Sequence, residues 1–268
     1  MFFRDDNNFY ICTISIVFIF TKKRNRNQTM KTKHLGKNNA KPLTGYKILD
    51  PIERIRSSES YGYDFWNAYE FSYLDLNKQP TLKVLEIKIP ASSSFIIESK
   101  SLKLYLNSFY KKHFSSDTDV LQKIKKDLSR VSTAKIELKF IKKFQVEPKS
   151  INLNTSTRKY TKKNYPICFD GFRSICPVTS QPDFAKIYIL SSTKIETKWL
   201  RKLLSSFKES GEFHEQCIEN IFSKLNKKFP NENIEICGRF LRRGGIDINP
   251  IRSSKRTLFF KNFRAFNQ

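Results

Sequence analysis

The sequence predicts an α+β protein made of two related lobes, and three observations support this fold class. Segments in which apolar residues alternate, as in strands, are interspersed with segments of helical spacing. The order strand, helix, helix, strand occurs twice. Residues 98–109 (ESKSLKLYLNSF) also align with residues 196–207 (ETKWLRKLLSSF) at a constant offset of 98 positions. Such a repeat indicates a duplicated unit, although two amphipathic helices can also resemble one another by chance.

The first lobe is predicted to span residues 46–145. Its first strand signal, LKVLEIKI, alternates with one slip at Val84-Leu85 and stops at Pro90. Asp117 or Asp119 is a candidate N-cap of the second helix, because a carboxylate can accept hydrogen bonds from the free amides of the first turn. The predicted elements are a strand at 82–89, helices at 102–109 and 120–131, and a strand at 135–141.

The second lobe is predicted to span residues 166–262, after a linker at 146–165 that is rich in Lys, Asn, Ser and Thr. Residues 263–268 form a tail. The predicted elements of the second lobe are a strand at 185–190, helices at 196–207 and 212–229, and a last strand at 234–241.

Residues 1–45 are predicted to be a mobile N-terminal arm. The apolar run at 11–20 is shorter than the ~20 residues that a membrane-spanning helix needs, and it lacks the small-residue cleavage site of a secretory signal. We therefore expect translation to begin at Met30, with residues 1–29 an extension of the reading frame. A peptide from residues 2–20 in the natural protein would contradict this.

The composition favours a globular protein of the reducing cytoplasm. Hydrophobic residues make up 39% of the chain, and its five cysteines form neither a C-x-x-C pair nor a Cys/His cluster, which argues against a disulfide framework or a bound metal. The net charge of +25 has two interpretations. It is either a nucleic-acid-binding surface or, as the abundance of Lys, Asn, Ile and Phe suggests, drift in an AT-rich genome. We favour drift and expect no direct nucleic-acid binding.

The segment CPVTSQPD, from Cys176 to Asp183, is the strongest chemical signal. Two prolines hold the backbone in a fixed, non-helical path, so that a thiol nucleophile and a carboxylic acid lie at a defined separation. The alternative is a buried cysteine in a proline-rich turn that Asp183 caps.

Two further segments offer binding groups. Glu215, in FHEQC, can accept paired hydrogen bonds from a ring N–H and an exocyclic amine, as on a guanine-like base. Alternatively, it only complements a helix dipole, with His214 a surface residue. The paired arginines and glycines of RRGG, from Arg242 to Gly245, are suited to an anionic ligand, although they also fit an ordinary turn. No G-x-G-x-x-G motif follows a strand.

Four segments in this order resemble the NADPH-dependent 7-cyano-7-deazaguanine reductases, the QueF family of queuosine biosynthesis, in its long two-lobe form. The resemblance covers about residues 35–253 and gives no counterpart for residues 1–29. It does not explain the charge, and the segment between Cys176 and His214 is slightly shorter than in some long members. The matching segments are IIESKSLKLYLNSF (96–109), CPVTSQPDFA (176–185), EFHEQCIENIF (212–222) and RRGGIDINPIRS (242–253).

The resemblance implies a fold and a reaction. The fold is two tandem T-fold (tunnelling fold) lobes, each an antiparallel sheet with two helices on one face, in a homodimeric cytoplasmic enzyme. The reaction converts 7-cyano-7-deazaguanine to 7-aminomethyl-7-deazaguanine with two NADPH molecules, without a metal. Cys176 is then the nucleophile that forms a covalent thioimide, and Asp183 is the proton donor. The substrate-binding residues are Ile97, Glu98, Ser99, His214 and Glu215, and the NADPH-binding residues are Ser99, Lys100, Arg243 and Gly244.

Two other functions compete with this one. A basic RNA-binding module on the same scaffold would not need Cys176, Asp183 and Glu215 together, yet all three are present. A T-fold cyclohydrolase acting on GTP or pterins would need metal ligands that the sequence lacks. The sequence therefore favours the nitrile reductase.

Overall fold

The computed structural model describes residues 44–56 and 59–268, all within one compact unit. The expectations for residues 1–43, including the apolar run and a start at Met30, lie outside the described residues. No helix in the described part of the chain is long and apolar enough to cross a membrane.

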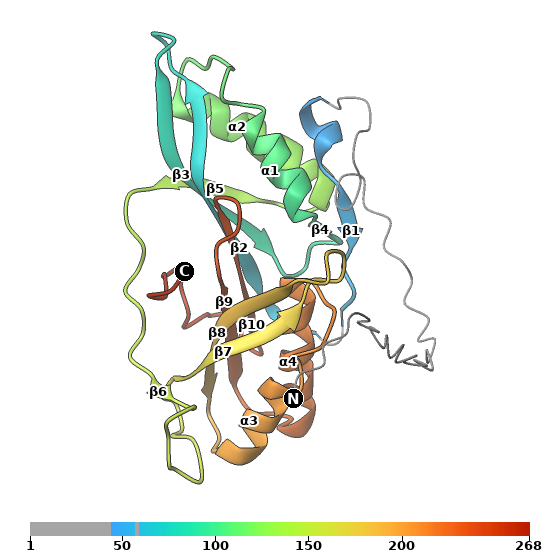
Figure 1. The fold of residues 1–268 in the computed structure, drawn as a ribbon, viewed down its shortest axis with the longest axis vertical. Coiled ribbons are helices and arrows are strands. Elements are labelled where there is room, and N and C mark those ends of the chain that lie inside the picture. The colour runs from blue at the N-terminus through green and yellow to red at the C-terminus, as the bar shows by residue number, and fades with distance from the viewer. Residues whose placement is uncertain (1–43, 57–58) are drawn as a thin grey trace, which may run out of the picture. The chain divides into compact units, whose positions relative to one another are not determined.

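Eight strands form one large sheet in which every neighbouring pair is antiparallel except β6 and β7 (Figure 1). The strand order is β5-β3-β2-β10-β9-β8-β7-β6, and the short strands β1 and β4 pair separately. The strands are β1 (Pro51–Glu53), β2 (Tyr61–Leu74), β3 (Pro80–Pro90), β4 (Phe95–Ile97), β5 (Glu137–Ile141), β6 (Ile151–Asn152), β7 (Ile167–Ile175), β8 (Pro182–Ser191), β9 (Ile234–Phe240) and β10 (Ile246–Ser253).

The pairing of β2 with β10 joins the two halves of the chain into this sheet. Eight consecutive residue pairs connect the strands, from Ile246 opposite Ala68 to Ser253 opposite Tyr61. The backbones come so close at Gly62 (φ +143°) that a Cβ atom there would lie 1.9 Å from the carbonyl oxygen of Ile251. This junction therefore requires glycine.

Four α-helices lie against the sheet, α1 and α2 beside β2 and β5, α3 and α4 beside β7, β9 and β10 (Figure 1). Apart from β1 and β4, which pair separately, the first half has the order β2, β3, α1, α2, β5, and the second half repeats it as β7, β8, α3, α4, β9 before β10. A short 3-10 helix at Gly45–Ile48 precedes β1. The helices are α1 (Ser99–Asn107), α2 (Asp117–Ser132), α3 (Thr197–Ser205) and α4 (His214–Lys228).

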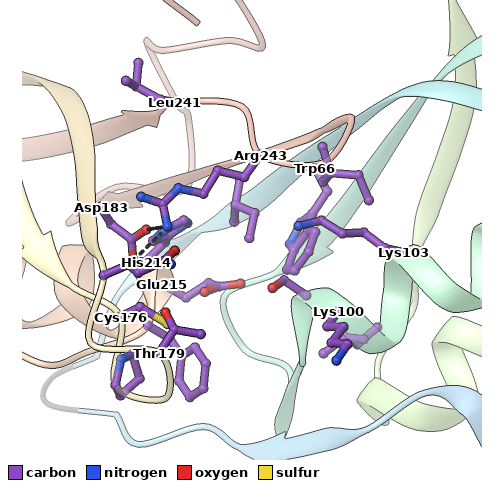
Figure 2. Close-up of a pocket in the computed structure, with 17 residues that line it drawn as sticks. Trp66, Lys100, Lys103, Cys176, Thr179, Asp183, His214, Glu215, Leu241 and Arg243 are labelled. Carbon is purple, nitrogen blue, oxygen red and sulfur yellow. Dashed lines mark ion pairs between the residues drawn. The ribbon is translucent and has the colours of Figure 1, made fainter. Parts of the chain in front are cut away.

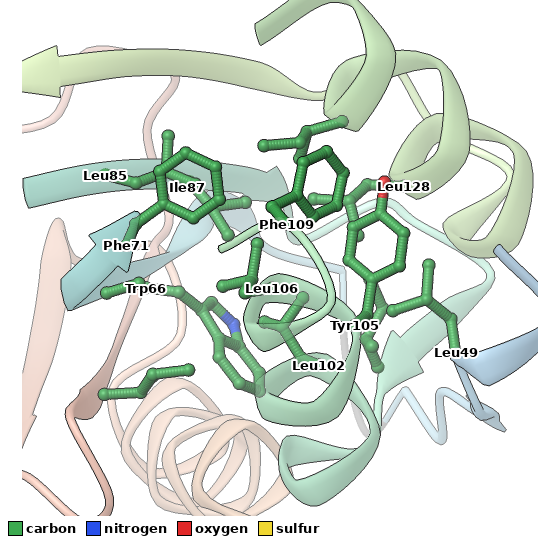
Figure 3. Packing of buried hydrophobic residues seen from close by; sticks show 14 of the residues in the cluster. Leu49, Trp66, Phe71, Leu85, Ile87, Leu102, Tyr105, Leu106, Phe109 and Leu128 are labelled. Carbon is green, nitrogen blue, oxygen red and sulfur yellow. The ribbon is translucent and has the colours of Figure 1, made fainter. Parts of the chain in front are cut away.

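Each helix pair buries its apolar face against its own half of the sheet. In the first half, Leu102, Leu106 and Leu128 pack on Trp66 and Phe71 (Figure 3). The second half has a core of the same kind. Phe260 and Phe263, from the chain after β10, belong to a third cluster with side chains from the other face of the strands. The sheet is therefore covered on both faces.

The expected helices are all present, and two of them, α1 and α2, begin three residues before the expected position. The α1 helix begins three residues early, at Ser99, because the Glu98 carboxylate caps it by accepting from the amides of Lys100 and Ser101. For α2, the expected caps are wrong. The Ser116 hydroxyl accepts from the Asp119 amide instead, and Asp117 is the first helical residue.

Two long strands that the sequence did not predict each contain a bulge. The pairing register shifts between Ala68 and Phe71 in β2, and between Phe169 and Phe172 in β7. A bulge places an extra residue in the strand and so interrupts the alternation on which strand prediction depends. The short β4 and β1 also lay outside the predicted elements.

The expectation that 234–241 is the last strand is wrong, because β10 follows it. The sequence of β10 did not indicate a strand, because its polar residues and Pro250 resemble a turn. The segment 146–165, predicted to be a linker, is in part structured. It contains β6, and its Leu153 is buried in the second core. The predicted tail likewise buries Phe263 and Gln268.

Candidate active site

A cavity of about 280 Å³ lies between the two halves of the chain (Figure 2). The first half contributes residues from β2 and from the start of α1. The second half contributes the turn after β7, the start of α4 and the β9–β10 connection. The β2–β10 junction thus brings together groups that are far apart in sequence.

Cys176 stands in a closed turn directly after β7. Its amide donates to the Gln181 carbonyl (2.8 Å), and the Ser180 amide donates back to the Cys176 carbonyl (3.0 Å). The preceding Ile175 exchanges backbone hydrogen bonds with Ser210 and Glu212, just before α4. This turn is therefore fixed to the segment that leads into His214.

Cys176 differs from the other described cysteines in exposure. It is partly exposed and lines the cavity, whereas Cys168, Cys217 and Cys237 are buried. Burial raises the pKa of Cys237 to about 11 and raises that of Cys217 as well. Because the thiolate is the reactive form, Cys176 is the thiol best placed for covalent chemistry.

Asp183, at the start of β8, lines the same cavity and is nearly buried. One carboxylate oxygen lies 2.9 Å from Nη1 of Arg243, and the other lies 3.3 Å from Nε2 of His214 (Figure 2). Arg243 also donates to the Pro182 carbonyl. The carboxyl group is thus held by two side chains from different elements.

The His214 ring is held by stacking on Phe240, with ring centroids 3.9 Å apart and an interplanar angle of 9°. Its Nδ1 atom is buried and has no hydrogen-bond partner among the described residues. The imidazole therefore has a fixed orientation and one unused hydrogen-bonding atom.

Glu215 lies in the first turn of α4, and its side chain is buried, with only 3% of the residue exposed. Burial, followed by the nearby negative charge of Asp64, raises its pKa to about 7. No ion pair holds it among the described residues, and it lines the cavity. A ligand that donates two hydrogen bonds would stabilise its ionised form.

A buried charge network lies behind Glu215. Arg252 contacts Asp64 (2.8 Å) and Glu219 (2.5 Å), and Arg54 contacts Asp64 (2.6 Å). Although burial opposes ionisation, the charges of Arg252 and Arg54 lower the pKa of Asp64. The guanidinium groups of Arg252 and Arg54 are thus paired with Asp64 and Glu219. The Glu215 carboxylate therefore remains available to a ligand in the cavity.

The first half supplies Ile97, Ser99 and Lys100 to the cavity, as well as Lys103, which the sequence analysis missed. Burial lowers the pKa of Lys103. Its position one turn beyond Ser99 on the same helix was the available signal, since residues four apart share a helix face. Trp66, on β2, forms part of the wall and had no sequence signal of its own.

Two predicted site residues lie beside the lining rather than in it. The Glu98 carboxylate is engaged at the start of α1, as described above. Gly244 has a positive φ of +56°, and this left-handed backbone conformation favours glycine. The other predicted residues all line one cavity: Ile97, Ser99, Lys100, Cys176, Asp183, His214, Glu215 and Arg243.

This arrangement is suited to covalent chemistry on a planar, polar ligand. It combines a thiol, a carboxyl group with two partners, and a buried carboxylate, with Lys100, Lys103 and Arg243 as cationic groups. Within the described residues, no three His, Cys, Asp or Glu side chains are grouped as metal ligands.

Comparison with known proteins finds two family matches. Residues 47–140 match the N-terminal region of the nitrile reductase 7-cyano-7-deazaguanine reductase, and residues 182–258 match the QueF-like protein family. Together they include the residues from both halves that line the cavity, apart from the Cys176 turn.

Three similar proteins are each named NADPH-dependent 7-cyano-7-deazaguanine reductase. The protein of Coxiella burnetii (strain Dugway 5J108-111) is 36% identical over 231 residues, and the match covers 78% of this chain and 82% of that protein. The protein of Buchnera aphidicola subsp. Schizaphis graminum is 35% identical over 245 residues, and the match covers 79% of this chain and 94% of that protein. The protein of Desulfotalea psychrophila is 36% identical over 253 residues, and the match covers 82% of this chain and 91% of that protein.

Proposed function

This chain belongs to the family of NADPH-dependent 7-cyano-7-deazaguanine reductases, and we propose on that basis that it reduces the nitrile of 7-cyano-7-deazaguanine to the aminomethyl group in queuosine biosynthesis. The enzyme is an oxidoreductase that acts on a nitrile with NADPH as reductant. The observation that carries the proposal is that Cys176, Asp183 and Glu215 line one cavity.

The proposed first step is covalent. The Cys176 thiolate adds to the nitrile carbon, one π bond of the C≡N group breaks, and Asp183 gives its proton to the nitrogen, which leaves a thioimide. The position of Asp183 supports this step because its side chain shares the cavity with the thiol and is oriented by His214 and Arg243.

The Glu215 carboxylate would accept from the ring N–H and the exocyclic amine of the deazaguanine, and His214 would contact the base from the cavity wall beside it. Ile97 and Ser99 line the cavity beside them. The buried position strengthens these hydrogen bonds, because little water competes for them.

NADPH, when bound, would supply the hydride for each of two steps. The first would convert the thioimide to an imine and release the Cys176 thiolate, and the second, with another proton, would give the amine. Lys100, Arg243 and Ser99 fit the cofactor because they combine positive charge with hydrogen-bond donors at the cavity wall. Enclosure of the substrate in the cavity would also protect the imine from hydrolysis.

Three broader features belong to the same proposal. The repeated order of elements supports two tandem T-fold lobes, each with two helices on one face. We also propose a homodimer and a cytoplasmic location, following the family.

The test is intact-mass measurement of the protein mixed with 7-cyano-7-deazaguanine in the absence of NADPH. A mass increase equal to the substrate, mapped to the peptide with Cys176 and absent in Cys176→Ala, is expected. The Cys168→Ala variant is the matched control and should still form the adduct. A folded wild-type protein that neither gains mass nor oxidises NADPH with this substrate would refute the function.

A further inference from the structure

The Gln268 side chain lies under the cavity, on the face of the sheet opposite the helices, and has no role in the function proposed above. It is 8% exposed. Its Nε2 atom donates to the Phe240 carbonyl (2.9 Å) and to Oδ1 of Asn249 (2.7 Å), while Oε1 accepts from the Ala265 amide (3.0 Å). The three contacts together require a side chain that both donates and accepts hydrogen bonds, as a carboxamide does.

The two hydrogen bonds from Nε2 of Gln268 connect β9 and β10 at a gap in the backbone pairing of these strands. Their ladder has only three residue pairs and ends where Cys237 faces Ile251. The next residue along β10 is Pro250, which has no N–H to donate. Beyond this point β9 continues to Phe240, paired with β8. The Gln268 amide connects the two strands where their own hydrogen bonds have stopped.

This gap adjoins the groups that act in the cavity. Phe240 is the last residue of β9, directly before the connection that carries Arg243, the partner of Asp183, and Asn249 is the fourth residue of β10, the strand that follows this connection. The Phe240 ring also supports His214. Displacement of the Phe240 backbone would therefore move two of the groups that face the ligand.

We propose that Gln268 is a positioning residue for the active site, because it bridges Phe240 and Asn249 and so fixes the Arg243 connection and the support of His214. The Asn249 side chain is itself anchored, since its Nδ2 donates to Asp247 (2.5 Å). The bridge is thus attached to a rigid strand at one side and to the cavity wall at the other. The expected kinetic effect rests on the proposed function, whereas the structural effect does not.

The test compares Gln268→Glu with Phe266→Ala. The glutamate has the same shape, but it has no donor for the two oxygens and adds a negative charge beside them. Phe266 lies in the same segment with its side chain fully exposed, so its replacement should change nothing. Gln268→Met, which has the length but neither donor nor charge, serves if the glutamate variant does not fold.

The first readout is hydrogen exchange of the free protein. The amides of residues 241–245 should exchange about tenfold faster in the Gln268 variant, the size expected from loss of a buried hydrogen bond, while those of β2 and β3 stay unchanged. Exchange that rises equally across the whole chain, or not at all, would overturn the proposal.

The second readout is steady-state kinetics. The KM for NADPH should rise about tenfold with a smaller change in kcat, because Arg243 is displaced rather than removed. A variant with wild-type KM would overturn the positioning role. If wild-type protein oxidises no NADPH, the proposed function fails, and the exchange measurement still decides the inference about Gln268.

Discussion

Replacement of Glu215 by Gln should remove a pH dependence of stability that this one carboxyl group causes. The glutamine keeps the shape of the side chain but cannot ionise. Burial, followed by the charge of Asp64, raises the Glu215 pKa from its ordinary value of 4.5 to about 7. The folded protein therefore holds this proton more tightly than the unfolded chain does.

The sign and size follow from that difference. Between pH 4.5 and 7 the folded state binds more protons than the unfolded state, so the free energy of unfolding falls as the pH rises. The contribution is complete below pH 4.5 and is lost as the pH passes 7. At ~1.4 kcal/mol for each pH unit, the loss amounts to about 3 kcal/mol for a group that is nearly inaccessible to solvent.

Urea unfolding of the wild type and the variant at several pH values between 4 and 8.5 measures this effect. The variant should gain stability relative to the wild type as the pH rises, by about 3 kcal/mol over the range. Glu209→Gln, at an exposed glutamate, is the matched control and should follow the wild type. A Glu215→Gln variant with the same pH slope as the wild type would show that the carboxyl ionises normally.

Three further predictions test the site and its support. Asp183→Asn should reduce NADPH oxidation by ~10²-fold or more, because the proton donor is lost, and a melting temperature near the wild-type value should show that the fold is intact. Arg252→Met should lower the free energy of unfolding by ~3–5 kcal/mol in urea titrations, because Asp64 is left with an incompletely balanced buried charge; a loss below ~1 kcal/mol would contradict this. Gly62→Ala should cost more than ~3 kcal/mol or prevent folding, because its Cβ would collide with the Ile251 carbonyl, and circular dichroism of a normally folded variant would refute that reasoning.

The sequence predicted those elements of the fold whose pattern is local and uninterrupted. The strand at β3 and the helices α2 and α4 have clear periodicity, and each lies within a few residues of its expected position. The longest strand, β2, was missed because its bulge and its many aromatic residues obscure the alternation. In β10, Asp247 and Asn249 alternate with two isoleucines and face the polar cluster on the far side of the sheet, but this alternation is short and ends at Pro250.

The candidate site was predictable as a set of residues but not as a set of contacts. Prolines in the chain indicated that Cys176 and Asp183 have a fixed spacing. The pairing of Asp183 with Arg243 depends on tertiary structure, because the two lie far apart in sequence. The same applies to the charge network around Asp64, for which no short motif exists.

The eight-residue ladder between β2 and β10 has a mechanical consequence. Hinge bending of one half of the protein against the other would break backbone hydrogen bonds along a strand at the centre of the sheet, so the two walls of the pocket keep a constant separation. Substrate entry and product exit must then depend on short-range rearrangements of surface turns, chiefly of residues 177–180, at the tip of the turn whose ends at Cys176 and Gln181 are hydrogen-bonded to each other. Mobility restricted to that turn, rather than a rigid-body rotation, is the motion to seek during turnover.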